Sequence, residues 1–417
     1  MNDHTEHPLR RKAIQLALRG LAPATILRRI PRSRAWFYKW QRRFHMAGWA
    51  GLHDQARDAH HLPHAYPQAV RAAVVQARYL LEQRTIGLIG PTAIQAELRS
   101  WPHIQSIPSR ATIRRILHAA GIPQRTPPPL LAPYYPQPTP TTLYPIHAMD
   151  WTERYLPGGT KVYAFHTIDL HSHAITQTIS ADKALPTVRR HLLQVWTAMG
   201  RPAGLQMDND GAFCGGYKVR RVFGQVVRLC LYMGIEPIFI PPGEPQRNGV
   251  VERLNGLWSA GFWQRYHFGN LAEVAASSPA FIAWYMHEYQ PPALGGQTPA
   301  QAHQPVAGQR VNAAQLHHLP ERLPITAGRV HFLRRVSAAG EIALLNERWR
   351  IGKRWAHRYV WATISTHRHE LRIYYRAGAQ APVRLLRRWA YPLDEPVASL
   401  RPEFHWPDRR RKVSTML

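Results

Sequence analysis

Three carboxylates in distinctive local settings are the residues of this sequence best suited to do chemistry. Asp208 opens the string Asp208-Asn209-Asp210-Gly211, and Glu252 follows after 43 intervening residues. The third acid, Asp150, lies upstream, directly before a tryptophan. Hard cations such as Mg²⁺ prefer oxygen ligands, usually one or two carboxylates each, and leave other positions for substrate phosphate. Two such ions held close together stabilise both the attacking and the leaving oxygen of a phosphoryl transfer. We therefore interpret the three acids as a cage for divalent metal.

Length and composition limit what kind of protein can carry this cage. A chain of 417 residues is expected to hold two to four domains, and a hydrophobic fraction of 45% is ordinary for globular protein. No run of 18 apolar residues occurs and the first residues are polar and basic, so we expect neither a membrane span nor a signal peptide. The two cysteines, Cys214 and Cys230, are more typical of reduced cytosolic thiols than of a disulfide framework. We expect a cytoplasmic protein that is associated with the nucleoid.

The net charge of +29 is concentrated in two flanks. Residues 1–140 carry 20 Lys and Arg against 6 acidic residues, and residues 301–417 carry 21 against 8. Residues 141–300 are nearly neutral, with 13 against 11. This distribution indicates nucleic-acid binding on both sides of a catalytic core, with double-stranded DNA as the partner. A generally basic proteome is the alternative explanation.

The N-terminal flank reads as two helical units, the first of which (residues 1–57) predicts a helix-turn-helix. Helices are expected over 9–19, 24–30 and 34–44, the last capped by Ser33. The third helix has the character of a recognition helix that enters a major groove. Its candidate DNA contacts are Arg34, Lys39, Arg42 and Arg43. A plain three-helix bundle with a solvated basic face remains the alternative.

The second helical unit spans residues 66–122, with helices expected over 68–82, 92–98 and 110–120. The last of these supplies three further candidate DNA contacts, Arg110, Arg114 and Arg115. Residues 123–143 then predict a linker, because eight prolines fall within 123–140.

The near-neutral middle, residues 144–300, predicts an α/β core with the element order βββαβαβα. The first three strands are expected over 146–153, 161–170 and 174–180 as an antiparallel meander. Asp150 falls on the first strand and Asp208 at the end of the fourth, and these strands are neighbours in an RNase-H-like sheet. The final helix begins near Pro245 and carries Asn248, Glu252 and Asn255 as a polar stripe beside its apolar face.

The C-terminal flank is rich in short strands, expected over 329–336, 342–351, 359–365 and 371–375. Basic and aromatic residues alternate there, so residues 320–395 predict a small basic β-barrel that binds nucleic acid. Residues 396–417 are interpreted as a basic tail that adds phosphate contacts.

At the level of motifs the sequence resembles the family of DDE transposases and retroviral-type integrases, above all bacterial insertion-sequence transposases with an integrase core. The resemblance rests on Asp150-Trp151-Thr152, the string 168–172, Asp208-Asn209 and the long string 240–253 that ends in Val251-Glu252-Arg253. It implies that Asp150, Asp208 and Glu252 hold two Mg²⁺ or Mn²⁺ ions. It also implies 3′-end cleavage of a mobile element, attack of the new 3′ hydroxyl on target DNA, and a homo-oligomer in the synaptic complex.

Two features depart from the family pattern. Asp210 stands between Asn209 and Gly211, where the family commonly has Asp-Asn-Gly, and the gap before Glu252 is longer than in many members. We expect Asp208 rather than Asp210 to be the ligand, because Asp208 directly ends a strand. Asp169 is interpreted as structural.

Gln246, Arg247 and Asn248 precede Glu252 at the start of the same helix. They are candidate DNA contacts, since helix N-termini attract phosphate. An equally supported alternative is that these three residues cap the helix and brace the loop before it. At the level of function, two other readings stay open: a DNA-binding regulator with a retired core, and an RNase-H-type nuclease that cuts RNA.

Overall fold

A computed structural model describes most of the chain, which divides into two compact units, Met1–Pro67 and Gln68–Leu417. The described residues are 3–54, 66–122, 134–214, 220–304, 310–312, 315 and 319–406. The expected Pro-rich linker falls mostly, and the cluster of basic residues at 409–412 wholly, outside these residues. None of the described helices combines the length and the apolar character that crossing a membrane requires.

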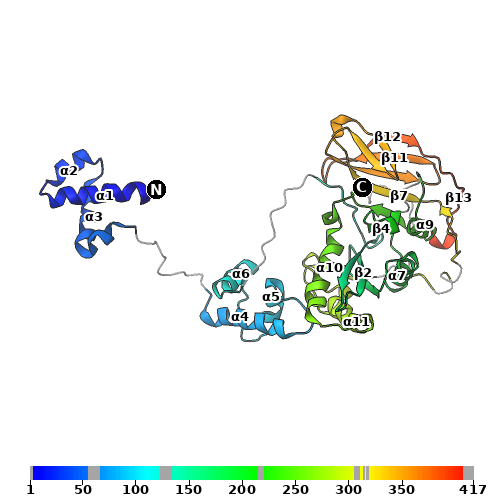
Figure 1. The fold of residues 1–417 in the computed structure, drawn as a ribbon, viewed down its shortest axis with the longest axis horizontal. Helices are drawn as coiled ribbons and strands as arrows, with labels where there is room; N and C mark the ends of the chain where they lie inside the picture. Colours follow the sequence, from blue (N-terminus) through cyan, green and yellow to red (C-terminus); the bar gives the residue numbers. More distant parts are fainter. Residues whose placement is uncertain are drawn as a thin grey trace. The chain divides into compact units, whose positions relative to one another are not determined.

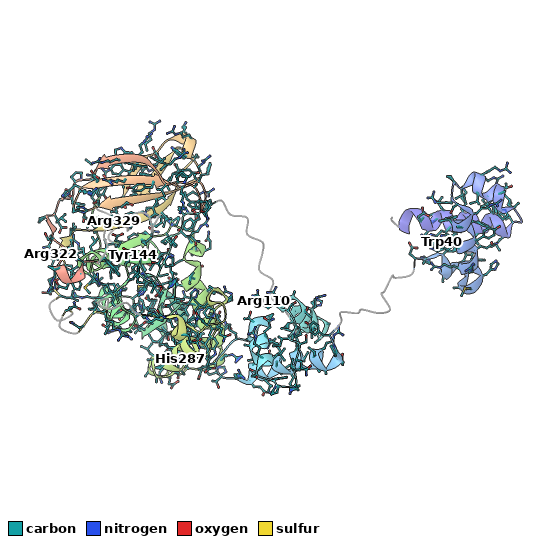
Figure 2. The ribbon with its side chains drawn as sticks, turned by 180° about the vertical axis from the view of Figure 1, so that it is seen from behind. Trp40, Arg110, Tyr144, His287, Arg322 and Arg329 are labelled. Carbon is teal, nitrogen blue, oxygen red and sulfur yellow. The ribbon has the colours of Figure 1, made fainter. Side chains whose placement is uncertain are left out.

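The first unit consists of short helices around a small apolar core. They are α1 (Asp3–Leu18), α2 (Pro23–Arg29), α3 (Arg34–Ala47) and the 3₁₀ helix η1 (Gly48–Leu52). Ser33 caps α3 by accepting a hydrogen bond from the backbone N–H of Trp36. Phe37 and Trp40, one helical turn apart, turn inward and are buried (Figure 2 labels Trp40). The three helices expected from the sequence are therefore present.

The second unit opens with three more helices, α4 (Gln68–Gln83), α5 (Pro91–Arg99) and α6 (Arg110–Ala119). Their apolar faces meet in one cluster that buries Val74, Leu98 and Leu117 completely. The turn after α4 contacts the core helices of the same unit. Arg265 donates to the carbonyl of Leu81 over 3.1 Å, and the N–H of Gly87 donates to the carbonyl of Gly261.

Residues 144–300 form one half of a nine-stranded sheet with the order β12-β11-β10-β7-β5-β4-β1-β2-β3. Its first five strands are β1 (Ile146–Tyr155), β2 (Lys161–Asp169), β3 (Ile175–Ser180), β4 (Gly204–Met207) and β5 (Glu236–Phe239). The first three are antiparallel to one another, and β4 and β5 run parallel to β1. This is the RNase-H-like arrangement that the sequence predicted.

Helices cover both faces of this half of the sheet (Figure 1). One face packs on α7 (Leu185–Ala198) and α9 (Gln225–Tyr232), and the short helix α8 (Gly211–Cys214) follows β4. The other face packs on α10 (Gly249–Gly261) and α11 (Leu271–His287). Further short elements are η2 (Pro245–Asn248), η3 (Trp263–Arg265), η4 (Pro292–Leu294) and α12 (Pro299–Ala302). The core thus has three layers, with the sheet buried between two helical layers.

The C-terminal strands continue this sheet, which corrects the expectation of a separate small barrel at 320–395. They are β7 (Arg329–Arg335), β10 (Tyr359–Ser365), β11 (Glu370–Tyr375) and β12 (Arg384–Ala390). β7 pairs in parallel with β5 through Phe332 and Phe239, and the other three follow it in antiparallel pairs (Figure 1). The reason is burial: Val330, Phe332 and Ile364 pack into the apolar cluster of the core instead of forming a separate one.

The rest of this region consists of small pieces. β6 (Ile325–Thr326) pairs with β13 (Val397–Ala398), and η5 (Lys353–Trp355) and η6 (Pro402–Phe404) are single turns. The strand expected over 342–351 is instead a hairpin of β8 (Glu341–Leu344) and β9 (Glu347–Arg350). Its two turn residues, Leu345 and Asn346, have positive φ, which Asn tolerates and which suits a tight hairpin turn.

Candidate active site

The register of β1 against β4 brings the two aspartates level at one edge of the sheet. Ala148 lies opposite Gln206, so Asp150 and Asp208 each follow two residues later along parallel neighbours. Side chains two residues apart share a face of a strand, and Gln206 faces α10, where its Nε2 donates to Asn248 Oδ1 over 2.9 Å. Asp150 and Asp208 therefore lie on the face that α10 covers.

Helix α10 places Glu252 and Asn255 over this edge. Val251, Leu254 and Trp258 are buried against the sheet, which commits the apolar side of the helix to packing. Glu252, in the first turn, is half-buried, and the described structure gives its carboxylate no hydrogen-bond or ion-pair partner. Asn255, about one turn further, donates from Nδ2 to Asp150 Oδ2 over 2.9 Å. The predicted polar stripe of this helix thus meets the sheet at Asp150.

Asp208 and Glu252 both act electrostatically on Asp150. The pKa of Asp150 is raised to about 7, first by burial and then by the charges of Asp208 and Glu252. Burial also raises the pKa of Asp208, to which Asp210 contributes a like charge, and burial raises the pKa of Glu252. Negative charge is therefore concentrated at this edge of the sheet, a condition that a cation would relieve.

The carboxylate oxygens of the three acids are ligands that suit a hard divalent cation, but the side chains are not arranged around a common point. Among the described residues, no group of three or more Asp, Glu, His or Cys side chains is arranged to hold an ion. Each oxygen of Asp150 accepts one hydrogen bond, from the Trp151 N–H at 2.8 Å and from Asn255, and a carboxylate oxygen has room for a further partner. Asp208 accepts from the N–H of Asp210 over 3.1 Å. The chemistry of the donors fits Mg²⁺ or Mn²⁺, which prefer oxygen ligands.

Asp210 turns to a different partner from Asp208. Its Oδ2 lies 3.1 Å from the Nζ of Lys183, in the loop before α7. The same Nζ lies over the ring of Trp151, 4.8 Å from its centre. Lys183 also lowers the pKa of Asp208, against the larger effect of burial. Asp210, the residue that departs from the family pattern, is therefore paired with Lys183.

A buried polar chain behind Asp150 was missed by sequence reasoning. His166 pairs with Asp150 across β1 and β2, and its Nδ1 lies 2.6 Å from Asn255 Oδ1. Its Nε2 lies 2.8 Å from Gln177 Nε2 on β3. Burial lowers the pKa of His166 to about 4, so the ring is neutral. Asn255 donates to Asp150 and therefore accepts from His166 Nδ1–H, while Nε2 accepts from Gln177. The sequence did offer a signal for His166: pairing the first two predicted strands as a hairpin would have placed it opposite Asp150.

Of the candidate DNA contacts Gln246, Arg247 and Asn248, two brace the loop before α10. Asn248 is 2% exposed, accepts from Gln206 and donates to the carbonyl of Met149 over 3.1 Å. Arg247 forms an ion pair with Glu244 at 3.1 Å and lies over the ring of Tyr135. The bracing alternative fits both. Gln246 is exposed and remains a candidate DNA contact.

Asp169 has a local structural role. It ends β2 opposite His147, three residues before Asp150 on β1, and its Oδ1 accepts from the N–H of His171 over 2.8 Å. His303 Nδ1 lies 3.8 Å from the other oxygen. These contacts secure the turn after β2 and agree with the structural interpretation.

The predicted cations of the helical units are mostly exposed. On α3, Arg34, Lys39 and Arg42 face solvent, whereas Arg43 is half-buried and donates to the carbonyl of His53 over 2.8 Å. On α6, the exposed cations are Arg110, Arg114 and Arg115 (Figure 2 labels Arg110). Their positions suit phosphate contacts, a role that stays a prediction.

Comparison with known families identifies the core. Residues 233–299 match the integrase core domain family, a segment that includes Glu252 and the loop before it. Residues 233–299 therefore carry an integrase core domain. In this integrase core, the matched segment supplies β5, α10 and α11, and Asp150 and Asp208 come from strands outside it.

Solved integrase structures show weak likenesses to parts of this chain. The HTLV-2 integrase catalytic core in complex with magnesium is 19% identical, with a TM-score of 0.30, over 38% of this chain and 95% of that one. The catalytic core of BIV integrase is 20% identical, with a TM-score of 0.28, over 38% of this chain and 92% of that one. The simian T-cell lymphotropic virus intasome in complex with PP2A regulatory subunit B56 gamma is 16% identical, with a TM-score of 0.31. The match covers 75% of this chain and 96% of that one.

Proposed function

We propose that this chain is a transposase that cleaves the 3′ ends of a mobile DNA element and joins them to target DNA. The observation that carries the proposal is the level placement of Asp150 and Asp208 on parallel strands, beneath the helix that bears Glu252. The raised pKa of Asp150, caused in part by the charges of the other two acids, supports a shared cation site. The match of residues 233–299 to the integrase core domain family supports the reaction class.

The chemistry follows from the donor set. Two Mg²⁺ or Mn²⁺ ions bound by the three carboxylates would neutralise the charge that develops on the reacting phosphate. The residues of the chain orient the ligands: Asn255 holds Asp150, with His166 behind it, and Asn248 ties the start of α10 to β1 and β4. Phosphoryl transfer needs in-line placement and charge stabilisation more than a protein nucleophile. Water and then the new 3′ hydroxyl of the DNA serve as nucleophiles.

The partners of the proposed reaction are double-stranded DNA and further copies of the chain. The exposed cations of α3 and α6 support contacts with phosphates of the element ends. The two ends of an element must be held together while both are joined to the target, so we propose a homo-oligomer in the synaptic complex.

The proposal is tested with three isosteric variants, Asp150→Asn, Asp208→Asn and Glu252→Gln. Each is expected to abolish Mn²⁺- and Mg²⁺-dependent cleavage of end-containing DNA and strand transfer, while DNA binding in a gel-shift titration stays within about twofold, because carboxylates bind the ions and basic flanks bind DNA. Asp182→Asn, on the exposed loop beside Lys183, is the matched control and is expected to cleave normally.

Three outcomes would replace the proposal. Full strand transfer by Glu252→Gln would remove that residue from the site. DNA binding without any metal-dependent cleavage by the unchanged chain would favour a regulator with a retired core. Cutting of an RNA–DNA hybrid in place of end-containing duplex would favour the RNase-H-type nuclease.

A further inference from the structure

Arg334, on β7, reaches from the C-terminal half of the sheet to the loop that carries Asp208. Its Nη2 donates to Asn209 Oδ1 over 2.7 Å, and its Nη1 donates to the carbonyl of Ile240 over 3.0 Å. Asn209 in turn donates from Nδ2 to the same carbonyl of Ile240. A triangle of hydrogen bonds therefore joins β7, the residue after Asp208 and the residue after β5.

The topology of the sheet explains how these three groups meet. β4, β5 and β7 are parallel neighbours in the sheet, so their carboxyl ends lie at the same edge. Phe332 pairs with Phe239, which places Arg334 two residues beyond the pairing, level with the loops that leave β4 and β5. The loop after β5 leads directly into α10 and Glu252. One side chain thus contacts both of the loops that carry acids.

The chemistry of this position calls for arginine. Arg334 is 7% exposed, and its guanidinium also donates from Nε to the carbonyl of Ala343 and from Nη1 to that of Leu333. A guanidinium directs five N–H donors in a fixed plane, whereas a lysine ammonium is a single compact group. Lysine could reach one of the two loops but could not hold both together with the β8–β9 hairpin.

A second contact from the same half of the sheet supports the loop before α10. The hydroxyl of Tyr359, on β10, donates to Glu244 Oε2 over 2.6 Å and accepts from Arg247 Nη2 over 2.9 Å. Arg247 lies against the ring of Tyr359 as well, 4.8 Å from its centre. The C-terminal strands therefore contact the two acid-bearing loops at two independent points.

We infer that Arg334 is a positioning residue for Asp208, and that the C-terminal half of the sheet is a structural part of the catalytic centre. The inference rests on the proposed function in so far as Asp208 is taken as a metal ligand. It assigns to residues 329–365 a role that their basic composition did not indicate.

The experiment compares Arg334→Lys with Arg228→Lys in the full chain. Arg228 is a similarly buried arginine that donates to the carbonyls of Phe223 and Leu323 and forms an ion pair with Glu395, none of which belongs to the acid-bearing loops. Two quantities are measured without DNA: amide hydrogen exchange of the peptide covering 206–213 in the absence of metal, and Mn²⁺ affinity by calorimetry.

For Arg334→Lys we expect faster exchange in 206–213 and Mn²⁺ affinity lower by roughly 10- to 100-fold, the usual effect of removing a group that orients a ligand. Arg228→Lys is expected to lower the unfolding temperature without either change. In addition, Asn209→Ala should weaken Mn²⁺ binding, and adding it to Arg334→Lys should cause little further loss, since both act through one hydrogen bond.

Unchanged exchange in 206–213 for Arg334→Lys overturns the inference, whatever the metal result. Faster exchange with unchanged Mn²⁺ affinity also overturns it, because the loop would then be braced without being positioned for the ion. Failure of the proposed function looks different: Mn²⁺ binding by the unchanged chain is then absent, or is equal in Asp208→Asn, while the exchange measurement still decides whether Arg334 braces the loop.

Discussion

The ammonium of Lys183 lies 3.1 Å from the carboxylate of Asp210, and this ion pair separates the two aspartates that flank Asn209. Asp208, at the end of β4, faces the site, and Asp210 faces the loop before α7. Alternation along a strand could not distinguish them, because residues two apart point the same way. The ion pair distinguishes them, because it holds the carboxylate of Asp210 against Lys183.

We therefore expect Asp210→Asn to keep at least partial metal-dependent cleavage, while Asp208→Asn has none. Both variants are measured in the same 3′-end cleavage assay over a Mn²⁺ titration. Lys183→Gln serves as the control for the ion pair and should resemble Asp210→Asn. Cleavage by Asp208→Asn together with inactivity of Asp210→Asn would show that the ligand was assigned to the wrong aspartate.

Asn255 connects Asp150 to the buried His166, so its removal should affect the reaction without removing a carboxylate. Asn255→Ala leaves the Nδ1–H of His166 unpaired and Asp150 without one of its two donors. We expect cleavage to fall by roughly 10- to 100-fold, with part of the loss recovered at high Mn²⁺. The measurement is the rate of 3′-end cleavage against Mn²⁺ concentration. Gln264→Ala, an exposed amide on η3, is the control, and an equal loss there would refute the specific role of Asn255.

Asn248 and Gln246 lie two residues apart but should respond in opposite ways. Asn248→Ala leaves the buried amide of Gln206 and the carbonyl of Met149 without a partner, and is expected to cost about 1–3 kcal/mol of unfolding free energy for each. Gln246→Ala, on the exposed side, should leave stability unchanged and weaken DNA binding. Urea unfolding and gel-shift titration of both variants test the contrast. A neutral Asn248→Ala would contradict the bracing role.

The basic face of α3 predicts salt-dependent DNA binding by residues 1–122. Affinity for end-containing DNA should fall steeply with salt, because binding to phosphates releases counterions. Replacing Arg34, Lys39 and Arg42 together with Gln should reduce the slope of log K against log salt by roughly 0.9 for each phosphate that these cations neutralise. Fluorescence anisotropy at several salt concentrations measures the slope, with Arg19→Gln, just after α1, as the control. An unchanged slope would leave α3 as part of a plain helical bundle.

Histidine burial in the core predicts loss of stability in acid. Burial lowers the pKa of His191 to about 3, and its two ring nitrogens lie 2.8 Å and 2.7 Å from the hydroxyls of Thr167 and Thr178. Between that pKa and the ordinary value near 6.5, the unfolded chain binds a proton that the folded chain does not. Stability therefore rises with pH through this window and is lost as pH falls.

His191→Gln should reduce this dependence by up to about 1.4 kcal/mol per pH unit, the contribution of one proton. Urea unfolding at several values between about pH 4.5 and 6.5, inside the window in which only the unfolded chain is protonated, gives the slope. Leu192→Val, a neighbouring core change without a titrating group, is expected to lower stability at every pH and to keep the slope. An equal slope for His191→Gln and the unchanged chain would contradict a neutral buried histidine.

Local pattern was sufficient for the elements of the core and for the position of Glu252. Alternation and turn residues placed the first three strands to within two residues at each end, because antiparallel strands joined by short turns depend mainly on nearby residues. Helical spacing identified the apolar side of α10, which in turn placed Glu252 at its edge. Asp150 and Asp208 followed from their positions on strands whose neighbours the family pattern supplied.

Long-range pairing decided the rest. The C-terminal strands read as a barrel because alternation reports that a strand has a buried face but not which sheet buries it. The parallel pairing of β7 with β5, His331 with Ile238 and Phe332 with Phe239, joins them to the core. The same holds for single side chains. For Arg247 the sequence left DNA contact and loop bracing equally open, and nothing singled out Arg334, yet each donates to an acceptor more than 90 residues away in the chain. Charge and spacing are local properties of a sequence, whereas the partner of a buried cation is determined by the tertiary fold.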